Sequence, residues 1–270
     1  MTDPESKPVK PLLFFDTGIG GISVLRESQA LIPNAPIIYA ADYAGMPYGM
    51  KSEAEIAARI PALLGRLVER YKPQLVTIAC NTASTVALEF VRSALDIPVV
   101  GTVPAVKPAS KFSKTRTIGL LGTKATIRQP YVDRLASKFA EDTCLLRFAA
   151  PELVYAAEAK FRGEKPDPQI FSDAISGLLD QDGGENIDVI ILACTHFPLV
   201  ETELQKFAPR PIKFVDGAKG IARRIKFLTA DQTWPEEKMP GTFVTTGSLK
   251  DIIPYHKALE AYNISTFETL

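Results

Sequence analysis

Residues 75–82 read Leu-Val-Thr-Ile-Ala-Cys-Asn-Thr, and residues 189–196 read Val-Ile-Ile-Leu-Ala-Cys-Thr-His. Each segment is a short apolar run of the kind that forms a buried strand, and each ends in Ala-Cys followed by polar residues. The two cysteines, Cys80 and Cys194, are 114 positions apart in a chain of 270 residues. This spacing predicts a doubled fold in which two thiols face one cleft, and it indicates a chemistry that uses both.

Strand-like runs alternate with helix-like stretches along the rest of the chain. Besides the two cysteine segments, strands are predicted at residues 11–15, 37–40, 98–100, 117–121, 145–148 and 242–245. Helices are predicted at residues 22–31, from Ser52 as N-cap, from Ala83, and at residues 125–139, 169–179 and 248–262. The repeated βα order predicts largely parallel sheets covered by helices on both faces, with ligands at the carboxyl ends of the strands.

Weak internal similarity divides the chain into two α/β domains. Residues 13–17 resemble residues 119–123 at an offset of 106, close to the 114 of the cysteine segments. We expect the chain to enter the second domain near residues 102–107 and to return near residues 214–220. The predicted first domain therefore comprises residues 1–103 plus 217–270, and the second comprises residues 104–216.

The composition argues against several classes of protein. Lys+Arg and Asp+Glu both number 31, so no net field favours nucleic acid or an anionic membrane, and we expect neither as a partner. No apolar run approaches the ~18 residues of a transmembrane helix. Residues 1–10 are polar and contain no apolar signal core, which predicts a short lead-in. Three cysteines without a Cys-x-x-Cys pair argue against a disulfide scaffold or zinc ribbon and fit a reducing cytoplasm.

A thiol between a strand and a helix faces backbone amides and the positive end of the helix dipole. That setting lowers a thiol pKa from ~8.5 toward neutrality. A lone free cysteine is more often a small buried apolar residue. The repeated context, with Asn81-Thr82 beside one thiol and Thr195-His196 beside the other, favours two reactive thiols. Cys144 has no such neighbours and is predicted to be structural.

Residues 16–21, Asp-Thr-Gly-Ile-Gly-Gly, lie at a predicted strand-to-helix turn. Glycines there let a ligand approach the backbone, the helix N-terminus can bind an anion, and Asp16 adds a carboxylate. The spacing does not match the Gly-x-Gly-x-x-Gly dinucleotide fingerprint. An aspartic protease needs a second Asp-Thr-Gly or Asp-Ser-Gly, which the chain does not contain. The alternative interpretation, that these glycines only form a structural turn, stays open.

Other polar positions carry less information by themselves. Tyr48 and Gly49, on the loop after the second strand, can offer a hydroxyl and an amide to a ligand, although any turn has such residues. Glu158 is interpreted from the residues alone as a solvated helix glutamate, and His256 as surface or core.

His196 lies two positions after Cys194, where it can exchange a proton with the thiol or hold a substrate carboxylate. Zinc binding by Cys80, Cys194 and His196 is disfavoured, because these residues lack paired local spacing. A Cys-His hydrolase is disfavoured because it needs only one thiol.

In combination these segments resemble the cofactor-independent glutamate racemase family of the aspartate/glutamate racemase superfamily. Residues 16–24 are similar to its Asp-Ser-Gly-x-Gly-Gly-x-Ser-Val motif, with Thr17 in place of serine. The other matching segments are Asp42 with residues 47–49, and residues 79–84, 122–126, 151–158 and 192–199. Together they extend from about residue 11 to about residue 220. Tyr43 stands where a smaller polar residue is common.

The resemblance implies a fold, a reaction and a site. The fold is two pseudo-symmetric flavodoxin-like three-layer domains with mainly parallel sheets and an active site in the cleft between them. The reaction is two-base interconversion of L- and D-glutamate at Cα, with no cofactor and no metal, which supplies D-glutamate for peptidoglycan in the cytoplasm. The implied catalytic residues are Cys80, Cys194, Asp16, His196 and Glu158, the last steering His196. The implied substrate-binding residues are Asp16, Thr17, Tyr48, Gly49, Asn81, Thr82, Thr123, Thr195 and His196.

Two rival functions and the oligomeric state stay open. A two-lobed amino-acid-binding protein would bind without exchanging the Cα proton, and it usually carries a signal peptide. A racemase for aspartate or another amino acid would keep the chemistry and change the substrate. The resemblance leaves a homodimer open as well as a monomer.

Overall fold

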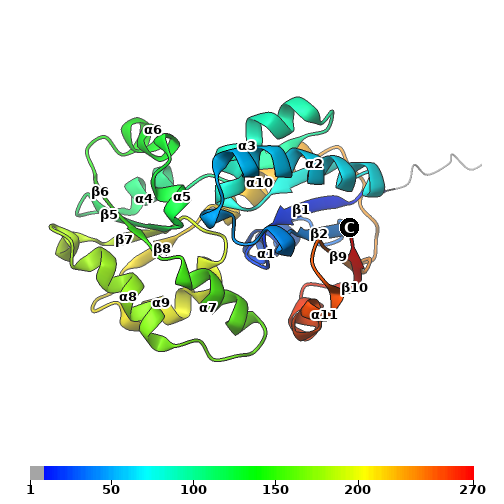
Figure 1. Ribbon diagram of the computed structural model, residues 1–270. Coiled ribbons are helices and arrows are strands. Elements are labelled where there is room, and N and C mark those ends of the chain that lie inside the picture. The colour runs from blue at the N-terminus through cyan, green and yellow to red at the C-terminus, as the bar shows by residue number, and fades with distance from the viewer. Residues whose placement is uncertain (1–8) are drawn as a thin grey trace, which may run out of the picture.

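The computed structural model describes residues 9–270, so residues 1–8 of the predicted polar lead-in lie outside the described part. The chain forms two sheets that lie side by side (Figure 1). Ten strands make these sheets: β1 Leu12–Asp16, β2 Ile37–Ala41, β3 Leu75–Ile78, β4 Val99–Gly101, β5 Thr117–Gly122, β6 Cys144–Ala149, β7 Val189–Leu192, β8 Lys213–Val215, β9 Gly241–Thr245 and β10 Ile264–Thr269.

The two sheets repeat one topology. The six-stranded sheet has the order β10-β9-β2-β1-β3-β4, and the four-stranded sheet has the order β6-β5-β7-β8. All of these pairings are parallel. The order β2-β1-β3-β4 recurs in the second sheet with each strand number raised by four. The segments that end in Cys80 and Cys194 contain β3 and β7, which are equivalent strands, so the predicted doubled fold of mainly parallel sheets is confirmed.

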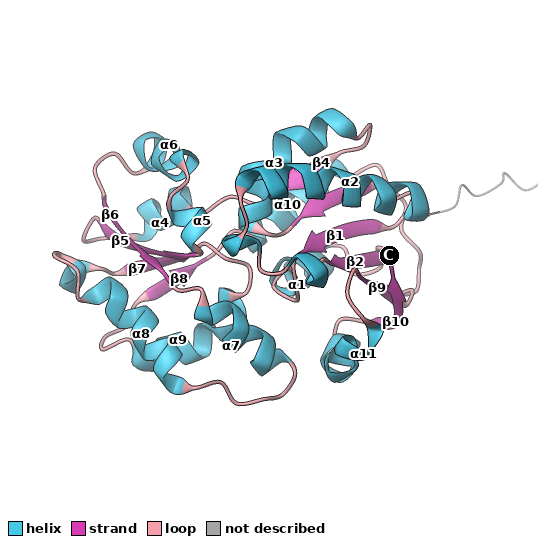
Figure 2. Cartoon of the chain, viewed as in Figure 1, coloured by secondary structure: helices cyan, strands magenta, loops and turns pink. Residues whose placement is uncertain are grey.

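Helices cover both faces of each sheet (Figure 2). The α-helices are α1 Ile22–Leu31, α2 Glu53–Tyr71, α3 Asn81–Ala94, α4 Val106–Phe112, α5 Lys124–Ile127, α6 Pro130–Phe139, α7 Glu152–Phe161, α8 Pro168–Leu179, α9 Glu201–Phe207, α10 Ala218–Leu228, α11 Leu249–Ile252 and α12 His256–Glu260. Short 3₁₀ helices are η1 Tyr43–Gly45, η2 Tyr48–Met50, η3 Gly184–Asn186, η4 Phe197–Val200 and η5 Ile253–Tyr255.

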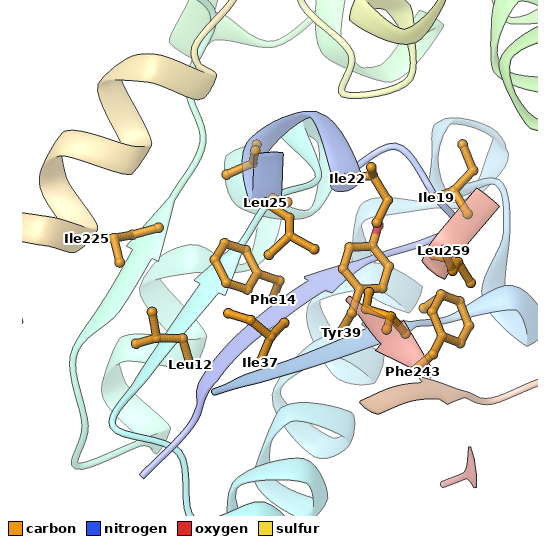
Figure 3. Packing of buried hydrophobic residues seen from close by; sticks show 14 of the residues in the cluster. Leu12, Phe14, Ile19, Ile22, Leu25, Ile37, Tyr39, Ile225, Phe243 and Leu259 are labelled. Atoms are coloured by element: carbon orange, nitrogen blue, oxygen red, sulfur yellow. The ribbon is translucent and has the colours of Figure 1, made fainter. Parts of the chain in front are cut away.

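The six-stranded sheet and its helices, here called the six-stranded lobe, have two apolar layers. One layer packs the sheet against α1, α10 and α12, and the other packs it against α2 and α3. Figure 3 shows the first layer, in which Phe14, Tyr39 and Phe243 project from neighbouring strands and are fully buried. The rings of Tyr39 and Phe243 stack with centroids 5.4 Å apart. These apolar contacts hold the carboxyl ends of β1, β2 and β3 in fixed positions.

The four-stranded sheet and its helices, here called the four-stranded lobe, are built in the same way. Helices α7, α8 and α9 cover one face, and α4 and α6 cover the other. The alternation of strand residues divides β7 between the layers: Ile190 and Leu192 join the first, while Val189 and Ile191 join the second. Cys194, two residues after β7, continues the face of Leu192 and joins the layer with α7.

The structure corrects two predicted helices. The stretch 125–139 is two helices, α5 and α6, because Pro130 begins a new helix at its first position. The stretch 248–262 is broken into α11, η5 and α12, with Pro254 in the first turn of η5. The tail strands β9 and β10 pair with β2 at the edge of the six-stranded sheet. The exact boundaries of the two domains stay a prediction.

Two short or polar strands, β8 and β10, are absent from the sequence prediction. β8 has only three residues, and β10 reads Ile-Ser-Thr-Phe-Glu-Thr without an apolar run. Within residues 9–270, no helix has the length and apolar character that crossing a membrane would require.

Candidate active site

A small cavity lies where the two lobes face one another. Both cysteines line it, Cys80 from the six-stranded lobe and Cys194 from the four-stranded lobe. The twelve described residues around it are Thr17, Pro47, Tyr48, Gly49, Cys80, Asn81, Thr82, Thr123, Val154, Cys194, Thr195 and His196. Every substrate-binding residue of the sequence prediction except Asp16 is among them.

Cys80 is the N-cap of α3 and is only 8% exposed. The position at a helix N-terminus predicts a lowered thiol pKa. The structure reverses this for Cys80: burial raises the pKa of the thiol well above its usual range, and the Asp16 carboxylate raises it further. The amides of Ala83 and Thr82 act in the opposite direction but do not outweigh burial. At neutral pH Cys80 therefore carries its proton.

Cys194 has different surroundings. It is followed by the short 3₁₀ helix η4, whereas Cys80 caps an α-helix of 14 residues. Its Sγ lies 3.9 Å from Nδ1 of His196, and both side chains are buried. Burial alone lowers the pKa of His196, but its hydrogen bonds with Cys194 and Glu158 outweigh burial and raise the pKa well above its usual range. This pair can therefore pass a proton between sulfur and imidazole.

Glu158 on α7 is buried, at 3% exposure, so its interpretation as a solvated helix glutamate is wrong. Its Oε1 lies 2.9 Å from Nε2 of His196. Burial raises the pKa of Glu158, but the hydrogen bond and the charge of His196 outweigh burial and leave the pKa below its usual range. The carboxylate therefore orients the imidazole so that Nδ1 faces Cys194.

Asp16 ends β1 beside the cavity without lining it. Its Oδ1 accepts a hydrogen bond from the Thr17 amide at 2.6 Å, and its Oδ2 accepts one from Oγ1 of Thr195 at 2.9 Å. Burial is the largest influence on Asp16 and raises the pKa of its carboxyl group, although His196 and Thr195 act against it. Asp16 is near enough to Cys80 to affect that thiol's pKa, but it lies behind the residues that line the cavity.

The glycines of residues 16–21 face protein side chains, whereas the sequence analysis expects a bound ligand there. A Cβ on Gly20 would lie 2.6 Å from Oγ1 of Thr195 and 2.5 Å from Nδ1 of His196. A Cβ on Gly18 would collide with the Glu158 carboxylate. Neither glycine lines the cavity. The small residues let the β1–α1 turn of one lobe approach the His196–Glu158 pair of the other.

Tyr48 and Gly49 approach the cavity from η2. The Tyr48 hydroxyl donates to Oδ2 of Asp42 at 2.5 Å, so its proton is already engaged and its oxygen can only accept from a ligand. Arg59 also donates to Asp42, through Nε at 2.5 Å. A Cβ on Gly49 would lie 2.9 Å from Cβ of Thr123, so Gly49 too permits a close approach of the lobes.

The polar wall of the cavity consists mainly of hydroxyl and amide groups. Oγ1 of Thr82 lies 3.2 Å from Oγ1 of Thr123 in the other lobe. Oδ1 of Asn81 is buried and makes no hydrogen bond with the described protein atoms. The twelve described lining residues include no lysine or arginine, so the negative charge of a ligand must be balanced by hydroxyls, the helix N-terminus at α3 and His196.

Two lining residues, Pro47 and Val154, are absent from the predicted site. Both lie inside the segments that carry the resemblance, residues 47–49 and 151–158, so the segments themselves are the signal that could have found them. Val154 is 5% exposed and gives the cavity an apolar wall from α7.

Some predicted features lie apart from the cavity. Cys144 is an exposed residue at the start of β6, and the ring of His256 stacks on Phe267 with centroids 3.7 Å apart. Within the described part of the chain, no three His, Cys, Asp or Glu side chains are grouped so that they could hold a metal ion. A larger open hollow beside Lys107, Lys111 and Lys138 contains none of the predicted site residues.

Comparison with known proteins places the chain in a family. A family model described as Asp/Glu/Hydantoin racemase matches residues 22–225. A glutamate racemase of Sphingopyxis alaskensis is 56% identical over 263 residues, which are 97% of this chain and 98% of the relative. A glutamate racemase of Haemophilus influenzae is 40% identical over 272 residues, which are 100% of this chain and 99% of the relative.

A solved structure agrees with these relatives. The crystal structure of Escherichia coli glutamate racemase in complex with L-glutamate and the activator UDP-MurNAc-Ala is 36% identical, with a TM-score of 0.89. The match covers 97% of this chain and 98% of that one. Sequence and fold thus agree over nearly the whole length, and the chain belongs to the Asp/Glu/hydantoin racemase family and, within it, to the glutamate racemases.

Proposed function

We propose that this chain interconverts L- and D-glutamate without a cofactor, using Cys80 and Cys194 as the two acid–base groups on opposite faces of Cα. The observation that carries the proposal is the cavity lined by one cysteine from each lobe. Inversion at Cα requires a group that removes the proton from one face and another that supplies a proton to the opposite face. Two thiols on facing lobes meet this requirement.

Glutamate is the proposed substrate because the relatives that match over nearly the whole chain are glutamate racemases. Its carboxylates would be bound by neutral donors and by the N-terminus of α3, where Asn81 and Thr82 line the cavity. The buried, unpaired Oδ1 of Asn81 can accept a hydrogen bond from the substrate ammonium group. The other proposed substrate contacts are Thr17, Tyr48, Gly49, Thr123, Thr195 and His196, whereas Asp16 lies behind the lining residues.

The reaction at Cys194 begins with a proton transfer within the protein. Glu158 holds the Nε2 side of His196, so Nδ1 can accept the proton of the Cys194 thiol. The resulting thiolate removes the Cα proton, and the electron pair of the broken C–H bond is delocalised into the α-carboxylate. Cys80, which carries its proton, protonates Cα from the other face.

The opposite direction uses the same groups in exchanged roles. Cys80 becomes the base, and the Asp16 carboxylate, at the end of the neighbouring strand β1 in the same lobe, is proposed to assist its deprotonation. The Cys194 thiol then supplies the proton, with His196 and Glu158 behind it. The carbanion is the difficult intermediate, and hydrogen bonds from hydroxyls and amides that line the cavity would supply its stabilisation.

The proposed biological role is supply of D-glutamate for peptidoglycan synthesis in the cytoplasm. The proposed active unit has two domains, residues 1–103 plus 217–270 and residues 104–216, with a homodimer as the proposed assembly. Both lobes of one chain line the cavity, so a monomer already contains the full set of proposed catalytic groups.

The proposal is tested by incubating the protein with L- or D-glutamate in D2O without added cofactor. Cα deuteration is followed by NMR and inversion by optical rotation, for wild type, Cys80→Ala and Cys194→Ala. We expect each substitution to reduce racemisation by at least about 1,000-fold, because one face of Cα then has no acid–base group. Cys144→Ala removes an exposed thiol and should retain the wild-type rate.

Racemisation at the wild-type rate in both active-site variants would exclude the two-thiol mechanism. Binding of glutamate without Cα exchange in wild type would indicate a binding protein. Exchange with aspartate but not with glutamate would keep the mechanism and change the substrate.

A further inference from the structure

Glu158 is bonded far more extensively than its role beside His196 requires. Its Oε1 accepts hydrogen bonds from His196 Nε2 at 2.9 Å and from the Ile19 amide at 3.0 Å. Its Oε2 accepts from the hydroxyls of Tyr43 at 2.9 Å and of Tyr255 at 2.8 Å. Four donors around one buried carboxylate hold it in a single position and favour its charged form.

Three of these four donors come from the other lobe. Glu158 lies on α7 and His196 directly precedes η4, and both elements belong to the four-stranded lobe. Ile19 follows β1, Tyr43 lies in η1 after β2, and Tyr255 lies in η5 of the C-terminal tail, all packed in the core of the six-stranded lobe. These contacts exist only while the two lobes are together.

We propose that Tyr43 and Tyr255 are positioning residues, which clamp Glu158 across the lobe interface and thereby fix His196 for proton transfer at Cys194. The inference rests on the proposed two-thiol function and adds two side chains to it. The clamp makes the proton partner of Cys194 dependent on the closed arrangement of the lobes.

The direction of the hydrogen bonds supports a positioning role. Nη1 of Arg162 donates to the Tyr255 hydroxyl at 2.7 Å, so the hydroxyl proton of Tyr255 points to Glu158. Arg162 is itself held by Glu164 through Nε at 2.7 Å. The Tyr43 hydroxyl donates to Oε2 of the same carboxylate and also lies within hydrogen-bonding reach of the Tyr255 hydroxyl.

The clamp serves only one of the two thiols. Asp16, the carboxylate near Cys80, is held by Thr17, Gly18 and Thr195, with no tyrosine among its described partners. Loss of the tyrosine hydroxyls should therefore weaken proton transfer at Cys194 and leave that at Cys80 intact. A purely structural role of the two tyrosines would affect both transfers alike.

The rings also have a packing role that the test must separate from the hydroxyls. Tyr43 and Tyr255 lie with ring centroids 5.7 Å apart, and Phe161 lies 6.3 Å from Tyr255. Replacement by phenylalanine keeps this packing and removes only the donor. Tyr71 provides the matched control, because it ends α2, its hydroxyl donates to Glu268 at 2.6 Å, and it does not line the cavity.

The experiment measures racemisation of both glutamate enantiomers, each with hydrogen or deuterium at Cα, by Tyr43→Phe, Tyr255→Phe, the double variant and Tyr71→Phe. Each single variant is expected to lower kcat about 10-fold and the double variant about 100-fold, as for other residues that orient a functional side chain. Because the two enantiomers are equally stable, kcat/KM must fall equally in both directions. The isotope effect therefore identifies which of the two proton transfers, at Cys80 or at Cys194, has become slower.

The Cα-deuterium isotope effect should rise for the enantiomer whose proton faces Cys194 and should not rise for the other. Cys194→Ser identifies that enantiomer. Tyr71→Phe should match wild type, and thermal unfolding should show all variants folded. A kcat within twofold of wild type in the double variant, or an equal rise of the isotope effect for both enantiomers, would overturn the clamp. Failure of the two-thiol proposal would appear separately, as wild-type protein that does not exchange the Cα proton.

Discussion

Cys80 and Cys194 occupy equivalent strand ends but have different neighbours. Cys80 lies at the N-terminus of α3 with the buried Asp16 nearby, and burial raises the pKa of its thiol. Cys194 lies 3.9 Å from His196, whose far nitrogen contacts Glu158. The repeat in the sequence thus places two thiols symmetrically, while residues from other segments give each thiol different neighbours.

The burial of Cys80 predicts how stability depends on pH. Its pKa is raised in the folded state from about 8.5 in the unfolded chain, so its contribution is complete below about pH 8.5 and is lost as pH rises toward the folded pKa. Between about pH 8.5 and 9.5, the unfolding free energy of wild type should fall by about 1 kcal/mol more than that of Cys80→Ala. Urea unfolding at several pH values measures this difference.

A matched thiol removal separates this effect from general alkaline destabilisation. Cys144→Ala deletes an exposed thiol and should keep the wild-type dependence on pH. Parallel curves for wild type and Cys80→Ala above pH 8.5 would show that the Cys80 thiol ionises as easily in the folded protein as in the unfolded chain.

The turn between β1 and α1 lies in close contact with the other lobe and fixes how the two lobes meet. Its glycines leave room for Thr195, His196 and Glu158, and the Ser23 hydroxyl at the start of α1 donates to the Thr195 carbonyl at 3.1 Å. His196 is therefore positioned from both sides, by α7 in its own lobe and by this turn in the other.

Gly20→Ala should strongly reduce activity without unfolding the protein. The added methyl group would lie 2.6 Å from Oγ1 of Thr195 and must displace Thr195 and His196. A shift of about 1 Å in a catalytic group commonly costs about 100-fold in rate, so we expect kcat/KM to fall by about that factor in a racemisation assay.

Gly65→Ala is the matched control for this substitution. Gly65 lies within α2, and a Cβ there would meet nothing within 4 Å. This variant should keep full activity and gain up to about 1 kcal/mol of stability from helix propensity. Wild-type activity in Gly20→Ala would show that the β1–α1 turn does not fix the position of His196.

The apolar strands could be predicted from the sequence because each is a short run of apolar residues that the fold buries. The predicted 75–78 and 189–192 segments are β3 and β7, and their equivalence follows from the repeated ending. Proline rarely lies inside a helix, so Pro130 and Pro254 could have indicated where the predicted helices are interrupted. The helix-like apolar pattern continues across both prolines and hides these interruptions. β10 lacks an apolar run because it is an edge strand with one half-exposed face.

The surroundings of Glu158 could not be predicted in the same way. Its partners lie 139, 115, 97 and 38 positions away in the chain, and local periodicity contains no information on contacts at such separations. The family motif alone pointed to Glu158, while Tyr43 stood out only as a departure from that motif. Tertiary contacts thus convert an ordinary helix glutamate into a buried carboxylate.

In the whole molecule, the cavity and the direct contacts between lobes occupy the same interface. Thr195 donates to Asp16 at 2.9 Å, Thr82 lies 3.2 Å from Thr123, and Gln129 donates to Glu53 at 2.7 Å. Phe161 of the four-stranded lobe adds aromatic contacts with Tyr255 and Tyr262 of the other lobe. A ligand that touches both lobes should add to the free energy that holds them together.

This coupling predicts that glutamate stabilises both lobes as one cooperative unit. The double variant Cys80→Ala/Cys194→Ala keeps each enantiomer pure, so L- and D-glutamate can be compared directly by calorimetry. At a concentration 100 times the Kd, either enantiomer should raise the unfolding free energy by about 2.7 kcal/mol, in a single transition. Glutamine, which lacks the second carboxylate, should stabilise less at equal concentration. Two separate transitions of which only one shifts would place the ligand in one lobe, because a bridging ligand must be released before either lobe can unfold.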